Sequence, residues 1–303
     1  MTVPTPLDLD QTIGFTIPAR HARGRLVRLG PVLDEILAAH AYPPAIERLL
    51  AEALALTALI GSTLKDPLGQ LTVQAQTQTG VVKLLVCDYR GGDLRGYVQF
   101  DADRLAEAPE EPTLFALFGE GYLAITFDLA GTGERYQGIV PLDGETLAAA
   151  AESYFVQSEQ IPTLINFGVT RDGAGHHIAG GLLLQHLPEG EVGRERLHAR
   201  LDHPEWEHVA ILGRTMGADE LADATIPLET LIWRLFNEED EVRVQERSGV
   251  RKGCRCDPAY IASVLAKFTP EDRLEMADEH GMINVDCAFC ATSFPVPAES
   301  ATP

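Results

Sequence analysis

The first half of the chain has two hydrophobic patterns in succession. Residues 31–66 have apolar positions at helical spacing, interrupted by Pro43–Pro44, so two helices are predicted. The segments that follow alternate apolar and polar residues or are rich in β-branched and aromatic residues, which is typical of strands. The separators between them are short and contain glycine, which favours antiparallel pairing. The strands are expected at residues 69–77, 81–89, 95–100, 122–129 and 132–140.

A helix and two more strands complete this first region. The helix is predicted to begin at Asp143, acting as its N-cap, and to end near Pro162. Further strand patterns cover residues 163–170 and 176–187. Residues 1–187 are therefore expected to form an α+β core, in which helices pack on a mostly antiparallel sheet.

The composition changes at residue 188, where the chain becomes highly charged and has few strand-forming residues. An amphipathic helix is predicted after Pro227, because apolar residues recur at i, i+3, i+4, i+7 and i+8. We call these residues the linker stripe, and they are Leu228, Leu231, Ile232, Leu235 and Phe236. A helical linker is accordingly placed at residues 188–245.

Charge and hydropathy narrow the classes of partner. The formal net charge is −21 over 303 residues, which repels phosphate backbones and disfavours nucleic acid as a partner. The most apolar run, at residues 49–61, contains Glu52 and is too short to span a bilayer. The N-terminus also lacks the pattern of a signal peptide. These features predict a cytoplasmic protein with no membrane partner.

Four of the five cysteines lie in the last fifty residues, as Cys254-x-Cys256 and, after 30 intervening residues, Cys287-x-x-Cys290. Four thiolates suit one tetrahedral Zn²⁺ per chain, with Zn–S distances of about 2.3 Å. Residues 246–303 are therefore predicted to form a small zinc-binding module. A module of this size buries too little apolar surface to fold securely alone, whereas zinc contributes on the order of 10–16 kcal/mol.

Within the module, helix starts are predicted at Asp257–Pro258 and at Thr269, and Gly281 is predicted to end the second helix. The spacing leaves open whether the zinc site is a passive staple or a redox-sensitive one. Disulfides within each cysteine pair would remove the cross-link between the ends of the module, whereas disulfides between the pairs would keep it. Adjacency in sequence favours the first outcome kinetically, but spacing does not decide.

Several segments together resemble the heat-shock protein 33 family of redox-regulated bacterial chaperones. The cysteine arrangement is one of them, and the sequence GERYQGIVPLDGETLAAAAESYFVQSEQIPT at residues 133–163 is another. AGGLLLQ at 179–185 and LIWRLFNEE at 231–239 are also similar to segments of that family. The similarity runs from about residue 10 to residue 295.

The resemblance implies a function in the response to oxidative stress. The reduced, zinc-bound form would be inactive, and oxidation would form the disulfides Cys254–Cys256 and Cys287–Cys290 and expel zinc. The module and then the linker would unfold, which would expose apolar surface. The active form, in this family often a homodimer, would hold unfolding client proteins without ATP. The linker stripe is the candidate client-binding surface.

Other functions fit the residues less well. The sequence contains no phosphate-binding loop of the Walker type. A metalloenzyme or dithiol oxidoreductase needs an open metal position or a resolving partner, and four thiolates leave no vacancy. A zinc-containing nucleic-acid adaptor conflicts with the net charge. The chain is thus predicted not to be an enzyme. Cys87 is interpreted as a core residue, and His176 and His177 as non-ligands on opposite faces of a strand.

Overall fold

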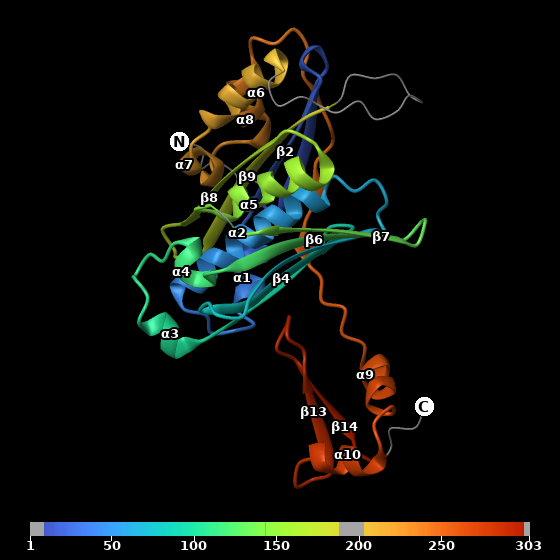
Figure 1. The fold of residues 1–303 in the computed structure, drawn as a ribbon. Helices are drawn as coiled ribbons and strands as arrows, with labels where there is room; N and C mark the ends of the chain where they lie inside the picture. The colour runs from blue at the N-terminus through green and yellow to red at the C-terminus, as the bar shows by residue number, and fades with distance from the viewer. Residues whose placement is uncertain (1–8, 143, 188–202, 300–303) are drawn as a thin grey trace, which may run out of the picture.

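The computed structural model describes residues 9–142, 144–187 and 203–299. Within these residues two six-stranded sheets lie on either side of a long central helix (Figure 1). Every pairing of neighbouring strands is antiparallel except that between β12 and β5. The first sheet has the order β10 (Arg243–Val244), β1 (Gln11–Ile17), β2 (Ala22–Leu29), β9 (His177–His186), β8 (Thr163–Arg171), with β11 (Ser248–Gly249) also on β1. The second has the order β12 (Arg251–Lys252), β5 (Asp93–Phe100), β4 (Val82–Arg90), β3 (Gln70–Thr77), β6 (Gly121–Leu129), β7 (Glu134–Pro141).

The central helix α2 (Pro44–Gly61) explains the most apolar run of the sequence. Thirteen of its residues are buried, because one side packs on the first sheet and the other on the second. A helix that is apolar all round is expected where both sides are covered. In the described part of the chain, no helix is both long and apolar enough to cross a bilayer. The helices α1 (Pro31–Leu37) and α5 (Leu147–Tyr154) join the same core.

The opposite face of the first sheet is covered by three helices, α6 (Pro204–Arg214), α7 (Ala218–Ala222) and α8 (Leu228–Phe236). All five residues of the linker stripe lie on α8 and are buried there, and the Phe236 ring lies 5.6 Å from the Phe15 ring of β1. The amphipathic helix predicted from the sequence is confirmed. Because both faces of β9 are covered, every one of its residues is buried.

A buried arginine fixes this helical layer to the sheet. Arg28 of β2 is 3% exposed, and its guanidinium donates hydrogen bonds to the carbonyl oxygens of Glu220, Leu221 and Ile226. Two of these carbonyls belong to the last turn of α7, where cations are favoured. Burial lowers the pKa of Arg28 to about 10, so the side chain stays charged at neutral pH.

The C-terminal module lies beyond the second sheet, after an extended segment (Figure 1). It contains α9 (Pro258–Leu265), α10 (Pro270–Met276) and a hairpin of β13 (Met282–Asp286) and β14 (Ser293–Pro297). Asp257 caps α9, and Thr269 and Asp272 form a capping box on α10, as the sequence predicts. Among the described residues of the module, the buried cluster is limited to Leu265, Ile283, Val296 and Ala298.

The α+β class and most predicted elements are confirmed, with three corrections. Strands β1 and β2 were not predicted, and β2 contains three arginines, among them Arg28, whose partners lie far away in the sequence. The predicted N-cap at Asp143, which lies outside the described residues, is wrong: α5 begins at Leu147, and Thr146 accepts a hydrogen bond from the Ala149 amide. Gly281 does not end α10, which stops at Met276; it has a φ of 73° in the turn before β13.

Shorter elements complete the described fold. They are the 3-10 turn Pro18–Arg20, the helices α3 (Ala102–Ala106) and α4 (Leu114–Phe118), and a π turn at Phe155–Glu159.

Replacing Arg28 should loosen the helical layer without unfolding the sheets. The substitution Arg28→Gln leaves buried carbonyl oxygens without a charged donor, which costs about 2–3 kcal/mol. We expect amide hydrogens of α7 and α8 to exchange roughly 30- to 100-fold faster, while those of α2 stay protected. The matched control is Arg25→Gln on the same strand, because Arg25 donates to the side-chain oxygen of the exposed Gln245. Equal exchange in both variants would contradict the anchoring role.

Candidate metal centre

The four C-terminal cysteines meet at one point. Their Sγ atoms all lie within 4.8 Å of one another, and each side chain is partly exposed. The distances are 3.1 Å for Cys254–Cys256, 3.6 Å for Cys254–Cys287 and 3.5 Å for Cys256–Cys290. Sulfurs around a tetrahedral metal at about 2.3 Å would lie about 3.8 Å apart, whereas a disulfide needs about 2.05 Å. The separations therefore fit a shared metal ion better than a disulfide.

Two different backbone elements deliver the two cysteine pairs. Cys254 and Cys256 follow β12, which lies beside β5. Cys287 and Cys290 lie in the turn between β13 and β14. There the amide of Ala291 donates to the carbonyl of Cys287 at 2.8 Å, and the amide of Cys287 donates to the carbonyl of Thr292 at 3.0 Å. The hairpin thus bends the second pair back toward the first.

The thiols differ in their electrostatic surroundings. Burial opposes ionisation of Cys290, but hydrogen bonds with the hydroxyl and backbone of Thr292 bring its pKa down to about 6. Burial raises the pKa of Cys254, and burial together with neighbouring sulfurs raises that of Cys256. A cation among the sulfurs would lower the raised pKa values of Cys254 and Cys256, because metal ligation favours the thiolate. The donor set therefore fits a metal ion that prefers sulfur.

Among the described residues, the cysteine cluster is the one group of three or more candidate metal ligands that lie together. His176 and His177 do not join it, since the Nδ1 atoms of both rings lie 2.8 Å from the carboxylate of Asp34. The expectation that these two side chains point to opposite faces of a strand is wrong, because His176 precedes β9 and both bond the same carboxylate. Cys87 is fully buried, as expected for a core residue, and burial raises the pKa of its thiol.

A close approach of two backbones places Cys254. The amide of Gly253 donates to the carbonyl of Leu94 at 3.0 Å, and a Cβ on Gly253 would lie 2.2 Å from the Cβ of Asp93. No side chain fits in that gap unless the backbone moves. Glycine at 253 therefore allows the chain to follow β5 up to Cys254, the first of the candidate metal ligands.

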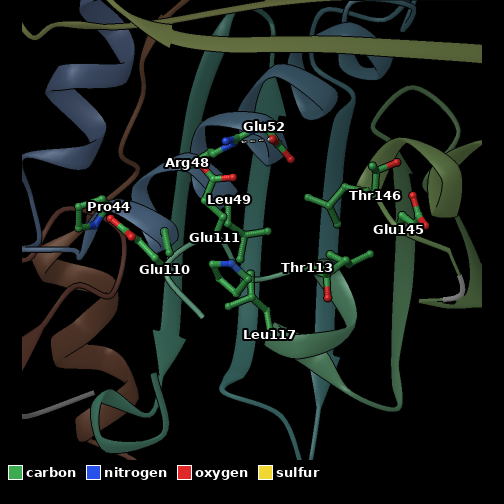
Figure 2. Close-up of a pocket in the computed structure, with 14 residues that line it drawn as sticks. Pro44, Arg48, Leu49, Glu52, Glu110, Glu111, Thr113, Leu117, Glu145 and Thr146 are labelled. Carbon is green, nitrogen blue, oxygen red and sulfur yellow. Dashed lines mark hydrogen bonds and ion pairs between the residues drawn. The ribbon is translucent and has the colours of Figure 1, made fainter. Parts of the chain in front are cut away.

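A pocket that was not predicted from the sequence lies away from the cysteines. It is lined by α2, the segment before α4 and the start of α5 (Figure 2). Its volume is about 470 Å³, and four glutamates contribute to its lining. Arg48 and Glu52 form an ion pair at 3.4 Å on its α2 side (Figure 2). The described lining contains no serine, histidine or cysteine, and the hydroxyls of its two threonines, Thr113 and Thr146, accept hydrogen bonds from the Ala116 and Ala149 amides as N-caps of α4 and α5.

The fold and the site together define a class: an α+β protein of two sheets with a separate module built around four cysteines. A family model described as Hsp33 protein matches residues 10–296. The "33 kDa chaperonin" of Caulobacter vibrioides is 41% identical over 289 residues, covering 93% of each chain. The protein of that name from Yersinia pestis is 38% identical over 279 residues, covering 91% of this chain and 88% of its own.

A solved structure has the same fold. The crystal structure of the 33 kDa chaperonin (heat shock protein 33 homolog) from Thermotoga maritima matches with a TM-score of 0.78 and 22% identity, covering 96% of each chain. The chain therefore belongs to the Hsp33 family of chaperones, as the resemblance in the sequence indicated.

A methyl group at position 253 should damage the metal centre. Gly253→Ala forces β12 away from Asp93, and overpacking of this kind costs about 1–2 kcal/mol, or roughly a 5- to 30-fold loss of metal affinity. The measurement is competition for Zn²⁺ with a chromogenic chelator under reducing conditions. Gly249→Ala is the matched control, since a Cβ there meets no atom within 4 Å. An unchanged affinity for Gly253→Ala would show that the approach to β5 does not position Cys254.

Proposed function

We propose that this chain is a redox-regulated, ATP-independent holdase, which oxidation of a four-cysteine zinc site activates to keep unfolding proteins from aggregating. The observation that carries the proposal is the approach of four sulfurs to within 4.8 Å, although the two cysteine pairs are 30 residues apart. Membership of the Hsp33 family supports the chaperone part.

Zinc is the metal we propose, one ion per chain, held by Cys254, Cys256, Cys287 and Cys290. It prefers tetrahedral thiolate ligands, and a closed shell of four cysteines leaves no position for a substrate, so the role is structural and not enzymatic. When bound, zinc stabilises four thiolates and cross-links the two ends of the module. With a cluster of four buried residues in its described part, the module depends on that cross-link.

Oxidation would remove the cross-link. Two molecules of peroxide would convert the four thiolates, with four protons, into two disulfides and four waters, and the sulfurs would then no longer be thiolate ligands. We propose the pairs Cys254–Cys256 and Cys287–Cys290. The 3.1 Å separation of the first pair supports this, since it is shorter than the 3.5 and 3.6 Å separations between the pairs. Small loops closed in this way restrain the unfolded chain little.

The backbone offers a route from the module to the linker stripe. After α8 the chain pairs with β1 through β10 and β11, then with β5 through β12, and then reaches Cys254. Loss of structure in the module would free these short strands one after another. Release of α8 would uncover its stripe together with Ile13 and Phe15, which pack in the same cluster. The linker stripe is therefore the proposed client-binding surface.

The remaining features of the proposal concern organisation and location. We propose a core at 1–187, a linker at 188–245 and a redox module at 246–303; residues 188–202 lie outside the described residues. Strands β11 and β12 belong by sequence to the proposed module but pair with strands of the core. The partners would be unfolding proteins, with homodimers in the oxidised state, in the cytoplasm, and without nucleic acid or membrane.

The central test follows zinc and client protection in one sample. Zinc-loaded, reduced protein is treated with hydrogen peroxide at a temperature that loosens the module, and a chromogenic chelator reports the metal. Light scattering of a denaturing client reports the holdase. We expect release of about one zinc per chain before scattering is suppressed, and disulfide mapping should show the two near-neighbour pairs. Full client protection with zinc retained would overturn the switch.

The fifth cysteine should be dispensable. Cys87→Ala removes a thiol that is fully buried and whose pKa is raised by burial, so it cannot react as a thiolate near neutral pH. We expect unchanged zinc content and activation, with a stability loss of about 1 kcal/mol from the small cavity. Metal analysis and the scattering assay check this. Loss of activation in a folded, zinc-loaded variant would make Cys87 part of the switch.

A further inference from the structure

The side chains that stand between the cysteines bind the outer face of the second sheet. Arg255, the residue between the first two cysteines, donates to Gln70 Oε1 of β3 at 2.6 Å and to Asp88 Oδ2 of β4 at 3.2 Å. Asp88 is 4% exposed and also accepts two hydrogen bonds from Arg95 of β5, at 2.6 and 2.8 Å. One buried carboxylate thus joins an arginine of the core to an arginine of the metal centre.

Phe289 makes the equivalent contact from the second cysteine pair. Its ring lies edge-on to Tyr97 of β5, with a centroid separation of 4.9 Å. The guanidinium carbon of Arg95 lies 3.9 Å from the centroid of the Phe289 ring, which is a cation–π contact. The carbonyl of the adjacent Ala288 lies 3.0 Å from Nε2 of His40. Phe289 therefore contacts β5, whereas Arg255 contacts the adjacent strands β3 and β4 of the same sheet.

Each half of the metal centre is consequently tied to the core on its own. The first pair is held by the β12–β5 pairing, by the Gly253 amide and by Arg255. The second pair is held by Phe289 and Ala288. None of the atoms in these contacts is a proposed metal ligand, so the contacts to the core are separate from the metal–sulfur bonds.

We propose that Arg255 and Phe289 are positioning residues and that the outer face of β3, β4 and β5 is the template that assembles the metal centre. Docking on one rigid surface raises the effective concentration of one cysteine pair around the other. Metal loss then requires the turn that carries Phe289, between β13 and β14, to leave Tyr97 and Arg95 before the cysteine pairs separate. The inference rests on the metal-binding part of the proposed function and is independent of oxidation, disulfides and clients.

The test measures zinc transfer to excess 4-(2-pyridylazo)resorcinol in reducing buffer, with no oxidant and no client. The variants are Phe289→Ala, Tyr97→Ala and the double variant. The matched control is Tyr122→Ala, which removes a half-exposed tyrosine of β6 from the same sheet without touching a cysteine segment. We expect each single variant to lose zinc about three- to tenfold faster, the range for losing one aromatic or cation–π contact, and the control to match the wild type.

The double variant identifies the contact. If Phe289 acts through Tyr97, the double variant loses zinc no faster than the faster single variant, because both remove one contact. The substitution Asp88→Asn removes the ion pair with Arg255 and tests the contact of the first cysteine pair in the same assay. Its control is Asp128→Asn, which removes the ion pair of Asp128 with Arg135 on the same sheet. Amide exchange gives a second readout: Ala288–Ala291 should exchange faster in Phe289→Ala while α2 stays protected.

Three results separate this inference from the proposed function. The template proposal is overturned if the double variant loses zinc at a rate increased by the product of the two single-variant effects. It is also overturned if both single variants lose zinc at the wild-type rate. A wild-type protein that takes up no zinc overturns both proposals. A wild-type protein that binds zinc and does not respond to oxidant overturns the switch alone, and faster zinc loss in the single variants then still supports the template.

Discussion

The approach of Cys254 and Cys256 to Cys287 and Cys290 is the contact on which the C-terminal module depends. The helices α9 and α10 and the hairpin β13–β14 enclose a buried cluster of four residues in the described chain. The apolar surface buried in this cluster is too small to offset the conformational entropy lost on folding some forty residues, which costs roughly 1.5 kcal/mol for each residue. The cysteines offer another source of stability, because their Sγ atoms lie 3.1 to 3.6 Å from one another and a metal ion bound among them would stabilise the folded module.

The rest of the molecule has the opposite character. Its main cluster extends from the first sheet through α2 to the second sheet, and Cys87 lies at its interior. Such a core is stable through packing alone, and removal of a metal ion elsewhere leaves its contacts intact. If the module depends on a metal ion, as we propose, one chain can lose part of its fold and keep the remainder. We propose that this asymmetry is the physical basis of regulation in this chain.

The helices α6 to α8 lie between these extremes. Their apolar side chains pack on one face of the first sheet, and Arg28 holds α7 through backbone carbonyls. Their connection to the module consists of short strands of two residues each, β10, β11 and β12. Short pairings at a sheet edge have few hydrogen bonds and open at low free energy. The layer that covers the outer apolar face of the first sheet is thus joined to the least stable part of the molecule.

Local patterns in the sequence determined most of the secondary structure, the α+β class and the four cysteines of the candidate metal centre. Apolar spacing predicted α1, α2 and α8, and alternation or a high content of β-branched and aromatic residues predicted β3 to β9, because each of these signals lies within a few neighbouring residues. The spacing of the two cysteine pairs predicted the cluster. Family resemblance supplied the chaperone function.

Contacts between distant segments had no such signal. Strand β2 was missed because its arginines have partners that only the fold supplies, such as the carbonyls of α7 for Arg28. The pattern of apolar and polar residues along the strands could not show that one face of the first sheet packs on α2 and the other on α8. Nor could it show that Arg255 and Phe289 contact Asp88 and Tyr97, which belong to strands far earlier in the chain. Such pairings are decided by tertiary packing, because the free energy of a long-range contact depends on the whole surface that brings its partners together.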